Sequence, residues 1–167
     1  MEDPATGPVG GPVDGAVVAE LLGLAHGYAE AVDTLDGVAF ADLFTGDGEL
    51  WVPDPPAGGD PTIRRAGRAQ LERIPSGLAR YHATHHAVRS STYEIGDGTA
   101  TGDVTGVAHH LSAGDPGDPA GGGTDMIWYL RYVDGYVRTG EGWRIRRRAL
   151  HLVATEVRAL AHLGPGR

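Results

Sequence analysis

The sequence has no cysteine, no lysine and no long run of apolar residues. Without cysteine there is no disulfide framework, no thiolate metal site and no cysteine nucleophile, so packing alone must stabilise the fold. A membrane helix needs roughly 18 consecutive apolar residues, so we expect no membrane contact. Hydrophobic residues still occupy 41% of the 167 positions, which is enough to bury the core of a single domain.

Charge is unevenly distributed along the chain. Residues 1–63 hold 12 acidic residues and no arginine, whereas residues 64–167 hold all 14 arginines and 10 acidic residues. We therefore expect the acidic half to pack on the arginine-rich half. The net charge of −8 argues against nucleic acid as a partner, because binding to phosphates needs a basic face.

The two ends of the chain differ in composition from the stretch between them. Residues 1–13 are rich in proline and glycine and show neither the basic start nor the apolar stretch of a signal peptide. They predict a disordered tail. We expect one domain over residues 14–160, a second short tail over 161–167, and a cytoplasmic location by default.

The first half of the predicted domain reads as helical. Apolar residues recur every three or four positions from Val17 to Leu35, as in an amphipathic helix, and Asp14 precedes them as an N-cap. Further elements are predicted in order: a helix over 36–44 capped by Asp36, a turn at 45–48, a strand at 49–52, a proline-rich loop at 53–61 and a helix at 67–79.

The second half of the predicted domain has the sequence pattern of β-strands. Strand patterns occupy residues 82–95, 99–112, 125–138 and 142–154. The low-complexity loop 113–124 predicts either a plain hairpin insertion or a lid over a pocket. Helices followed by an antiparallel meander predict an α+β fold, in which N-terminal helices pack on a strongly curved, mostly antiparallel sheet. Such a sheet leaves a concave mouth that suits a small ligand.

Several short sequence segments resemble segments of a known family, and they follow one another in the same order as in that family. They lie at residues 28–36, 40–48, 84–86, 98–100, 132–139 and 142–148. Together they resemble the SnoaL-like branch of the nuclear transport factor 2-like superfamily over roughly residues 15–155. The resemblance implies a cone-shaped barrel with a deep apolar cavity, as in scytalone dehydratase, bile-acid dehydratase, ketosteroid isomerase, limonene epoxide hydrolase and polyketide cyclases. The superfamily also contains binding domains without catalysis, so the fold alone does not decide the function.

Asp33 is the acidic residue that has no simple structural explanation. Asp36 suits a helix N-cap and Asp47 a turn, whereas Asp33 falls at the edge of the apolar arc of the first helix. Periodicity alone leaves it open whether Asp33 faces solvent or a cavity. The resemblance implies a cavity-facing acid, because the family's dehydratases keep an aspartate at this position.

Two pairs of adjacent histidines lie in predicted strands. Neighbouring side chains on a strand point to opposite faces, and His110 shares its face with small apolar residues, so His110 is the inward candidate. Alternation does not choose between His85 and His86. The resemblance selects His86, with His85 as the alternative after a shift of one residue. We expect Asp33 and His86 to form an acid–base pair, with His110 as a second proton donor.

Aromatic residues and one arginine complete the predicted site. The aromatic candidates for lining the pocket or donating to an enolate oxygen are Tyr28, Trp51, Tyr81, Trp128 and Tyr132. On the last strand, alternation places Arg144, Arg146 and Arg148 on an outer face and Arg147 on the face that would bind a substrate carbonyl or carboxylate.

Other site chemistries fit the sequence less well. A metal site would draw on His82, His85, His86 and His110, yet no helix carries the paired histidines of a zinc protease. A serine hydrolase would need a Gly-x-Ser-x-Gly elbow, which the sequence lacks. We therefore expect neither a metal nor a cofactor.

The expected function is that of a cofactor-independent lyase or isomerase. It would dehydrate, isomerise or cyclise a small apolar carbonyl compound, such as a polyketide or steroid-like intermediate, by Asp/His acid–base catalysis. Epoxide opening by an aspartate-centred site and non-catalytic binding of a small molecule are the alternatives. The resemblance also implies a homo-oligomer, either a dimer or a trimer.

Overall fold

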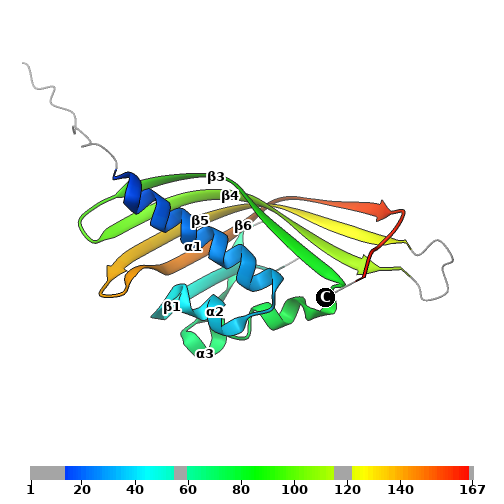
Figure 1. The fold of residues 1–167 in the computed structure, drawn as a ribbon, viewed down its shortest axis with the longest axis horizontal. Helices are drawn as coiled ribbons and strands as arrows, with labels where there is room; N and C mark the ends of the chain where they lie inside the picture. The colour runs from blue at the N-terminus through cyan, green and yellow to red at the C-terminus, as the bar shows by residue number, and fades with distance from the viewer. Residues whose placement is uncertain (1–13, 55–59, 115–121, 166–167) are drawn as a thin grey trace, which may run out of the picture.

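Helices cover one face of a six-stranded sheet in this computed structural model (Figure 1). The structure describes residues 14–54, 60–114 and 122–165. The predicted tail at 1–13 and most of the low-complexity loop lie outside the described residues. Among the residues that are described, no helix is long and apolar enough to span a membrane.

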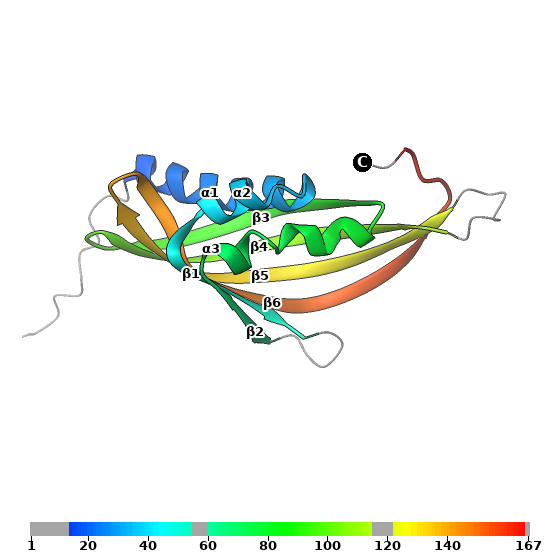
Figure 2. The ribbon, with the colours of Figure 1, turned by 90° about the horizontal axis from the view of Figure 1, so that it is seen from below.

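The sheet has the strand order β2-β1-β6-β5-β4-β3. Its strands are β1 (Phe44–Pro53), β2 (Pro61–Ala66), β3 (Ala83–Ile95), β4 (Thr99–Ala113), β5 (Gly123–Thr139) and β6 (Gly142–Leu160). Neighbours are antiparallel except for β1 and β6, which run parallel. Figure 2 shows that the sheet is curled. The predicted α+β class is confirmed, but the sheet does not close into a barrel.

The first helix, α1 (Gly15–Asp33), packs mainly on β3 and buries the predicted apolar stripe. Asp14 caps it by accepting a hydrogen bond of 3.0 Å from the backbone N–H of Ala16. The helix ends at Asp33, two residues earlier than predicted. Leu35 adopts a left-handed conformation with φ 60°, and the following N–H donates back to Ala31, which closes the last turn.

Three predictions between residues 36 and 80 need correction. Helix α2 (Gly37–Asp42) is capped by Asp36 as expected, but residues 45–48 lie within β1 and not in a turn. Strand β2 was missed because its sequence follows a proline-rich loop. The predicted helix 67–79 is divided into α3 (Arg68–Leu71) and the 3₁₀ helix η1 (Pro75–Arg80), because Pro75 has no N–H to continue an α-helical ladder.

Small residues on β4 leave room for the residues of neighbouring strands. The inward face carries Ala100, Gly102, Val104, Gly106 and Ala108. A Cβ at Gly102 would lie 2.9 Å from a ring carbon of Tyr136, and one at Gly106 would lie 2.9 Å from the carbonyl oxygen of Ala87. These glycines are therefore required by packing against their neighbours.

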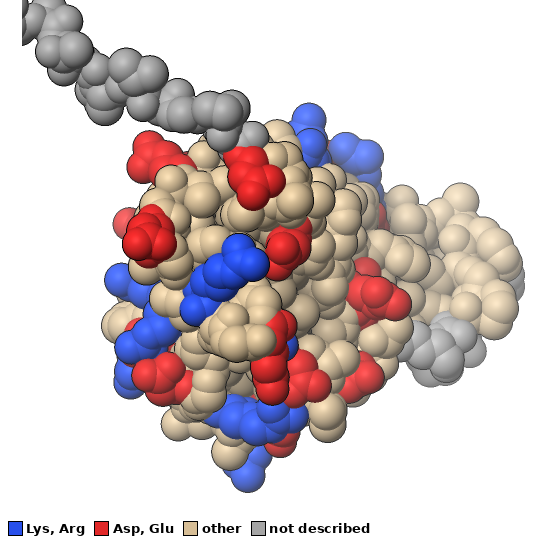
Figure 3. All heavy atoms as spheres, turned by 60° about the vertical axis from the view of Figure 1, so that its left-hand side comes forward, with Lys and Arg blue, Asp and Glu red and all other residues tan. Residues whose placement is uncertain are grey.

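Ion pairs join the acidic half of the chain to the arginine-rich half. Glu49 pairs with Arg64 at 2.6 Å, and Asp42 pairs with Arg68 at 2.7 Å. These contacts involve β1 and α2, not a uniformly acidic helical layer. Figure 3 accordingly shows acidic and basic side chains interspersed over one face of the molecule.

Candidate active site

Asp33 and His86 meet where the end of α1 crosses the start of β3. The Oδ1 atom of Asp33 lies 2.7 Å from Nδ1 of the His86 ring, and Oδ2 accepts a hydrogen bond of 2.7 Å from the His86 backbone N–H. Thr84 donates a third hydrogen bond, of 2.8 Å, to Oδ1. Thr84 and His86 point to the same side because they alternate along β3. The result is an imidazole oriented by a carboxylate.

The Asp33 carboxylate lies in an unfavourable place for a negative charge. It stands at the C-terminus of α1, which is the negative end of the helix dipole, and its burial raises its pKa. Hydrogen bonds from the side chain and backbone of His86 and from Thr84 outweigh burial, so the pKa of Asp33 lies below its ordinary value. An acid that conflicts with its local setting and is held ionised by its neighbours is typical of a functional site.

These contacts determine where His86 carries its proton. An ionised carboxylate only accepts hydrogen bonds, so the ring proton lies on Nδ1. In the neutral ring, Nε2 then has a free lone pair. The His86 side chain is only 11% exposed, which keeps this nitrogen largely away from bulk water. His86 therefore has the tautomer and orientation of a general base.

His110 lies beside this pair, between two aromatic rings. Its ring centre is 5.8 Å from that of His86 and 4.8 Å from those of both Tyr81 and Trp128. Its Nδ1 lies 3.1 Å from the carbonyl oxygen of Met126, which can only accept. Burial is the largest influence on the pKa of His110 and lowers it to about 4.

The predicted role of His110 as a proton donor therefore needs correction. A neutral His110 with its proton on Nδ1 presents Nε2 as an acceptor. It is suited to receive a hydrogen bond from a substrate hydroxyl. The rings of Tyr81 and Trp128 both pack against His110.

A set of buried aromatic and charged side chains lies on the inner side of His86. His86, Tyr28, Tyr132 and Arg148 help to line a cavity of about 10 Å³, roughly the space of one water molecule. This cavity is far smaller than the deep apolar cavity that the resemblance implies. The Arg148 guanidinium lies over the rings of Tyr28 and Tyr132, at 4.4 and 4.6 Å. Burial raises the pKa of Tyr28 to about 12 and that of Tyr132 well above its ordinary value. Both hydroxyls are protonated at neutral pH.

Arg148 is held in this position by Asp134. Two hydrogen bonds, of 2.9 and 2.7 Å, join the guanidinium to the carboxylate. Burial alone would lower the pKa of Arg148, but the charge and hydrogen bonds of Asp134 raise it. The remaining nitrogen, Nη1, is buried without a hydrogen-bond partner among the described residues. It is a charged donor that a bound oxygen would satisfy.

Three of the predicted site residues lie elsewhere. His85 is exposed on the opposite face of β3, where it pairs across the strands with His109. Trp51 alternates with the core residue Leu50 and thus also lies on the opposite face of the sheet. Arg147 is exposed and lies with its guanidinium 5.2 Å from the centre of the Trp51 ring. None of the three reaches the site around Asp33 and His86.

A β-bulge explains why alternation failed on the last strand. Tyr136 pairs with Ile145, but Gly135 pairs with Arg147, so Arg146 is an extra residue in β6. After this bulge the inward positions shift by one. Arg148 is therefore buried, and Arg147, predicted to face the cavity, is exposed.

Sequence reasoning missed Thr84, Asp134 and Arg148. Thr84 has a signal in the sequence, since it precedes His86 by two positions and must share its face. Asp134 lies in a strand pattern among aromatic and apolar residues, where a charged residue is expected to have a buried partner. No local signal identifies that partner, because the bulge becomes visible only once β5 and β6 are paired.

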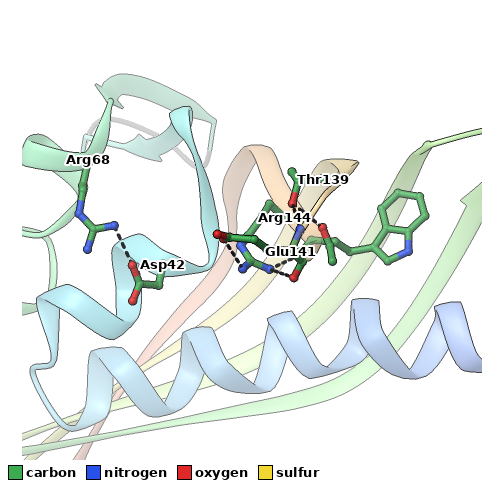
Figure 4. A network of polar contacts seen from close by, with 7 residues as sticks. Asp42, Arg68, Thr139, Glu141 and Arg144 are labelled. Atoms are coloured by element: carbon green, nitrogen blue, oxygen red, sulfur yellow. Dashed lines mark hydrogen bonds and ion pairs between the residues drawn. The ribbon is translucent and has the colours of Figure 1, made fainter.

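A polar cleft of about 380 Å³ lies between α2, β1 and the β5–β6 turn. Figure 4 shows that its two arginines already have acidic partners, with Arg68 paired to Asp42 and Arg144 to Glu141. The cleft is therefore neutralised internally and does not match the site around His86. No group of three or more metal-ligating side chains occurs among the described residues.

Comparisons with known proteins agree with the fold. The sequence pattern of the SnoaL-like domain matches residues 16–149. No curated protein matches the chain.

Solved structures with the same fold include proteins of different chemistry. A variant of Rv3472 from Mycobacterium tuberculosis, described as a protein of unknown function, is 26% identical, covers 85% of this chain and 76% of its own, and has a TM-score of 0.67. A putative scytalone dehydratase from Novosphingobium aromaticivorans is 20% identical, with coverages of 91% and 96% and a TM-score of 0.68. The hexachlorocyclohexane dehydrochlorinase LinA-type3 from Novosphingobium barchaimii is 16% identical, with coverages of 90% and 95% and a TM-score of 0.70. At these identities the last two show the fold alone.

Proposed function

Since the chain belongs to the SnoaL-like family, we propose that it is a cofactor-independent lyase or isomerase acting on a small, largely apolar carbonyl compound. The observation that carries this proposal is the 2.7 Å contact between Asp33 and the His86 imidazole. The putative scytalone dehydratase with the same fold is consistent with such an activity. Polyketide or steroid-like intermediates belong to the proposed substrate class.

In the proposed mechanism, Nε2 of His86 removes a proton from the carbon next to the substrate carbonyl. Asp33 stabilises the imidazolium that forms, because its charge lies against Nδ1. The protonated hydroxyls of Tyr28 and Tyr132 and the free Nη1 of Arg148 are the candidate donors to the developing enolate oxygen.

The same imidazolium can return the proton. Delivery to a β-hydroxyl releases water and leaves a conjugated double bond, whereas delivery to another carbon completes a double-bond migration. An enolate that instead attacks a second carbonyl of the substrate gives cyclisation. His110 orients the hydroxyl by accepting its hydrogen bond at Nε2. One base thus serves all three outcomes, and the substrate selects among them.

Epoxide opening fits the geometry around Asp33 less well. It would require Asp33 to activate a water molecule or an internal hydroxyl directly. Both oxygens of Asp33 are instead engaged by His86 and Thr84. Non-catalytic binding is the remaining alternative, and the experiment below separates it from catalysis.

Exposed valines on β5 and β6 support a further part of the proposal, that copies of the chain associate. Val133 is 40% exposed, and Val153 and Val157 are each 67% exposed. Apolar surface of this kind favours an interface when it is contiguous. Light scattering after size-exclusion chromatography would measure the mass, and a monomer at micromolar concentration would argue against association.

The proposed activity is tested by solvent exchange and dehydration of a defined probe. The probe is 3-hydroxy-1-tetralone, whose dehydration gives 1-naphthol. In D₂O, wild type should accelerate deuterium incorporation next to the carbonyl, measured by NMR, and release 1-naphthol, whereas His86→Gln should do neither. A probe that binds, raises the melting temperature and is recovered unchanged and undeuterated would favour a binding domain.

A further inference from the structure

Arg80 is an exposed cation at the end of η1. Among the described residues it has no carboxylate within ion-pair distance, whereas Arg64, Arg68 and Arg131 each contact an acid. An arginine without an acidic partner keeps its charge and its donors available to a ligand.

Contacts of the Arg80 side chain connect it to the candidate active site. Its Nη2 donates a hydrogen bond of 3.1 Å to the hydroxyl of Tyr81, and its guanidinium carbon lies 4.9 Å from the centre of that ring. Tyr81 in turn packs 4.8 Å from His110, whose ring centre is 5.8 Å from that of His86. Arg80 is thus separated from the proposed base by two intervening rings.

The charge of Arg80 also affects the pKa of His110. Burial is the main reason that the pKa of His110 is lowered, and the positive charge of Arg80 adds to the effect.

A second unused donor lies on Trp128, whose ring centre is 4.8 Å from that of His110. The indole Nε1 of Trp128 is buried and has no hydrogen-bond partner among the described residues. A buried donor without a partner is costly and is satisfied when an acceptor binds. Two donors thus lie near the neutral His110: Nε1 of Trp128, whose ring packs against His110, and the guanidinium of Arg80, which contacts Tyr81. Their common complement is an acceptor-rich, negatively charged group.

We propose that Arg80 recognises an anionic group on the ligand, so that the substrate is an apolar carbonyl compound bearing a carboxylate at the end remote from His86. The proposal relies on the proposed function for placing the ligand beside His86. Arg80 then acts as a specificity determinant that orients the reacting end toward His86.

The test compares two probes of nearly equal shape, 2-naphthoate and its neutral analogue 2-naphthamide. Isothermal titration calorimetry at pH 7.5 and low salt would measure their dissociation constants for wild type, Arg80→Gln, Arg80→Lys and Arg89→Gln. Arg89 is a matched control, since it is exposed and has no acidic partner among the described residues but lies in a groove with Tyr129 and Val153. Melting temperatures would confirm that every variant is folded.

We expect wild type to bind 2-naphthoate about tenfold or more tightly than 2-naphthamide, with a preference that declines as salt is added. Arg80→Gln should abolish this preference, and Arg80→Lys and Arg89→Gln should keep most of it. Equal affinity of the two probes for wild type, including no measurable binding of either, would overturn the proposal, as would a preference that survives in Arg80→Gln. Because these probes do not react, a lack of turnover would contradict the proposed function without affecting this result.

Discussion

Arg148 and Asp134 form an ion pair with two hydrogen bonds, and neither side chain is exposed to solvent. Tyr136 adds a third contact, donating a hydrogen bond of 2.6 Å to the same carboxylate. The pair lies beneath α1, in contact with the rings of Tyr28 and Tyr132. The pair is therefore part of the protein core and also lies next to the cavity beside His86.

Loss of one partner of this pair should be strongly destabilising. Arg148→Met leaves the Asp134 carboxylate buried without its counter-charge, and we expect it to lower the free energy of unfolding by about 3–5 kcal/mol. The exposed pair of Arg131 and Asp103 is the control, and Arg131→Met should cost about 1 kcal/mol or less. Urea unfolding would measure both. A loss from Arg148→Met no greater than the control would show that the pair is not buried as described.

Asp33→Asn should separate the orientation of His86 from the stability of the fold. An amide cannot stabilise the imidazolium, so we expect kcat/KM, or the rate of α-deuterium exchange, to fall by about 10²–10⁴-fold. Asp36→Asn is the matched control, because asparagine caps a helix about as well as aspartate. A similar loss in both variants would indicate a general effect on folding instead of a role for Asp33 in the site.

The adjacent histidines provide an internal comparison. His86→Gln should remove the base and abolish measurable exchange, whereas His85→Gln should leave the rate within about twofold, because His85 is exposed on the other face of β3. Single-turnover kinetics on the same probe would test both. An active His86→Gln variant together with an inactive His85→Gln variant would mean that β3 and β4 pair with a register shifted by one residue.

His110 should make stability depend on pH. Its pKa is about 4 in the folded protein and about 6.5 when unfolded, so the unfolded state binds more protons between these values. The free energy of unfolding should therefore rise with pH from about 4 to 6.5, by at most about 3 kcal/mol, and the contribution of His110 should level off above that.

Comparison of variants isolates this contribution. His110→Gln should flatten the slope between pH 4 and 6.5, whereas His85→Gln should retain it. Chemical unfolding at a series of pH values would measure the slopes. An unchanged slope in His110→Gln would mean that His110 is not held neutral by burial.

Much of the local structure could be predicted because it depends on nearby residues. Asp14 and Asp36 cap their helices through backbone N–H groups two or three residues away, and the small face of β4 follows from simple alternation. The resemblance identified Asp33 and His86 as partners. Periodicity alone had left Asp33 between solvent and cavity, because it lies at the edge of the helical stripe.

Predictions failed where pairing between distant strands determines the outcome. The short strand β2 exists because β1 is available to pair with it, and its own sequence resembles a loop. Arg147 and Arg148 exchange faces because a bulge in β6 is required to match β5. The neutral state of His110 depends on its burial in the folded protein, where its Nδ1 faces the carbonyl of Met126 on β5.

The sequence by itself determined the order of the elements, the α+β class and the residue types available for acid–base chemistry. These follow from side-chain periodicity, capping and composition, which act over a few residues. The tertiary structure supplied the geometry of the expected contact between Asp33 and His86. It alone decided that Arg148 is buried with Asp134 and that Trp51 and Arg147 lie outside the site. Those relationships join atoms on different elements, and they depend on strand register and on burial, which no local pattern specifies.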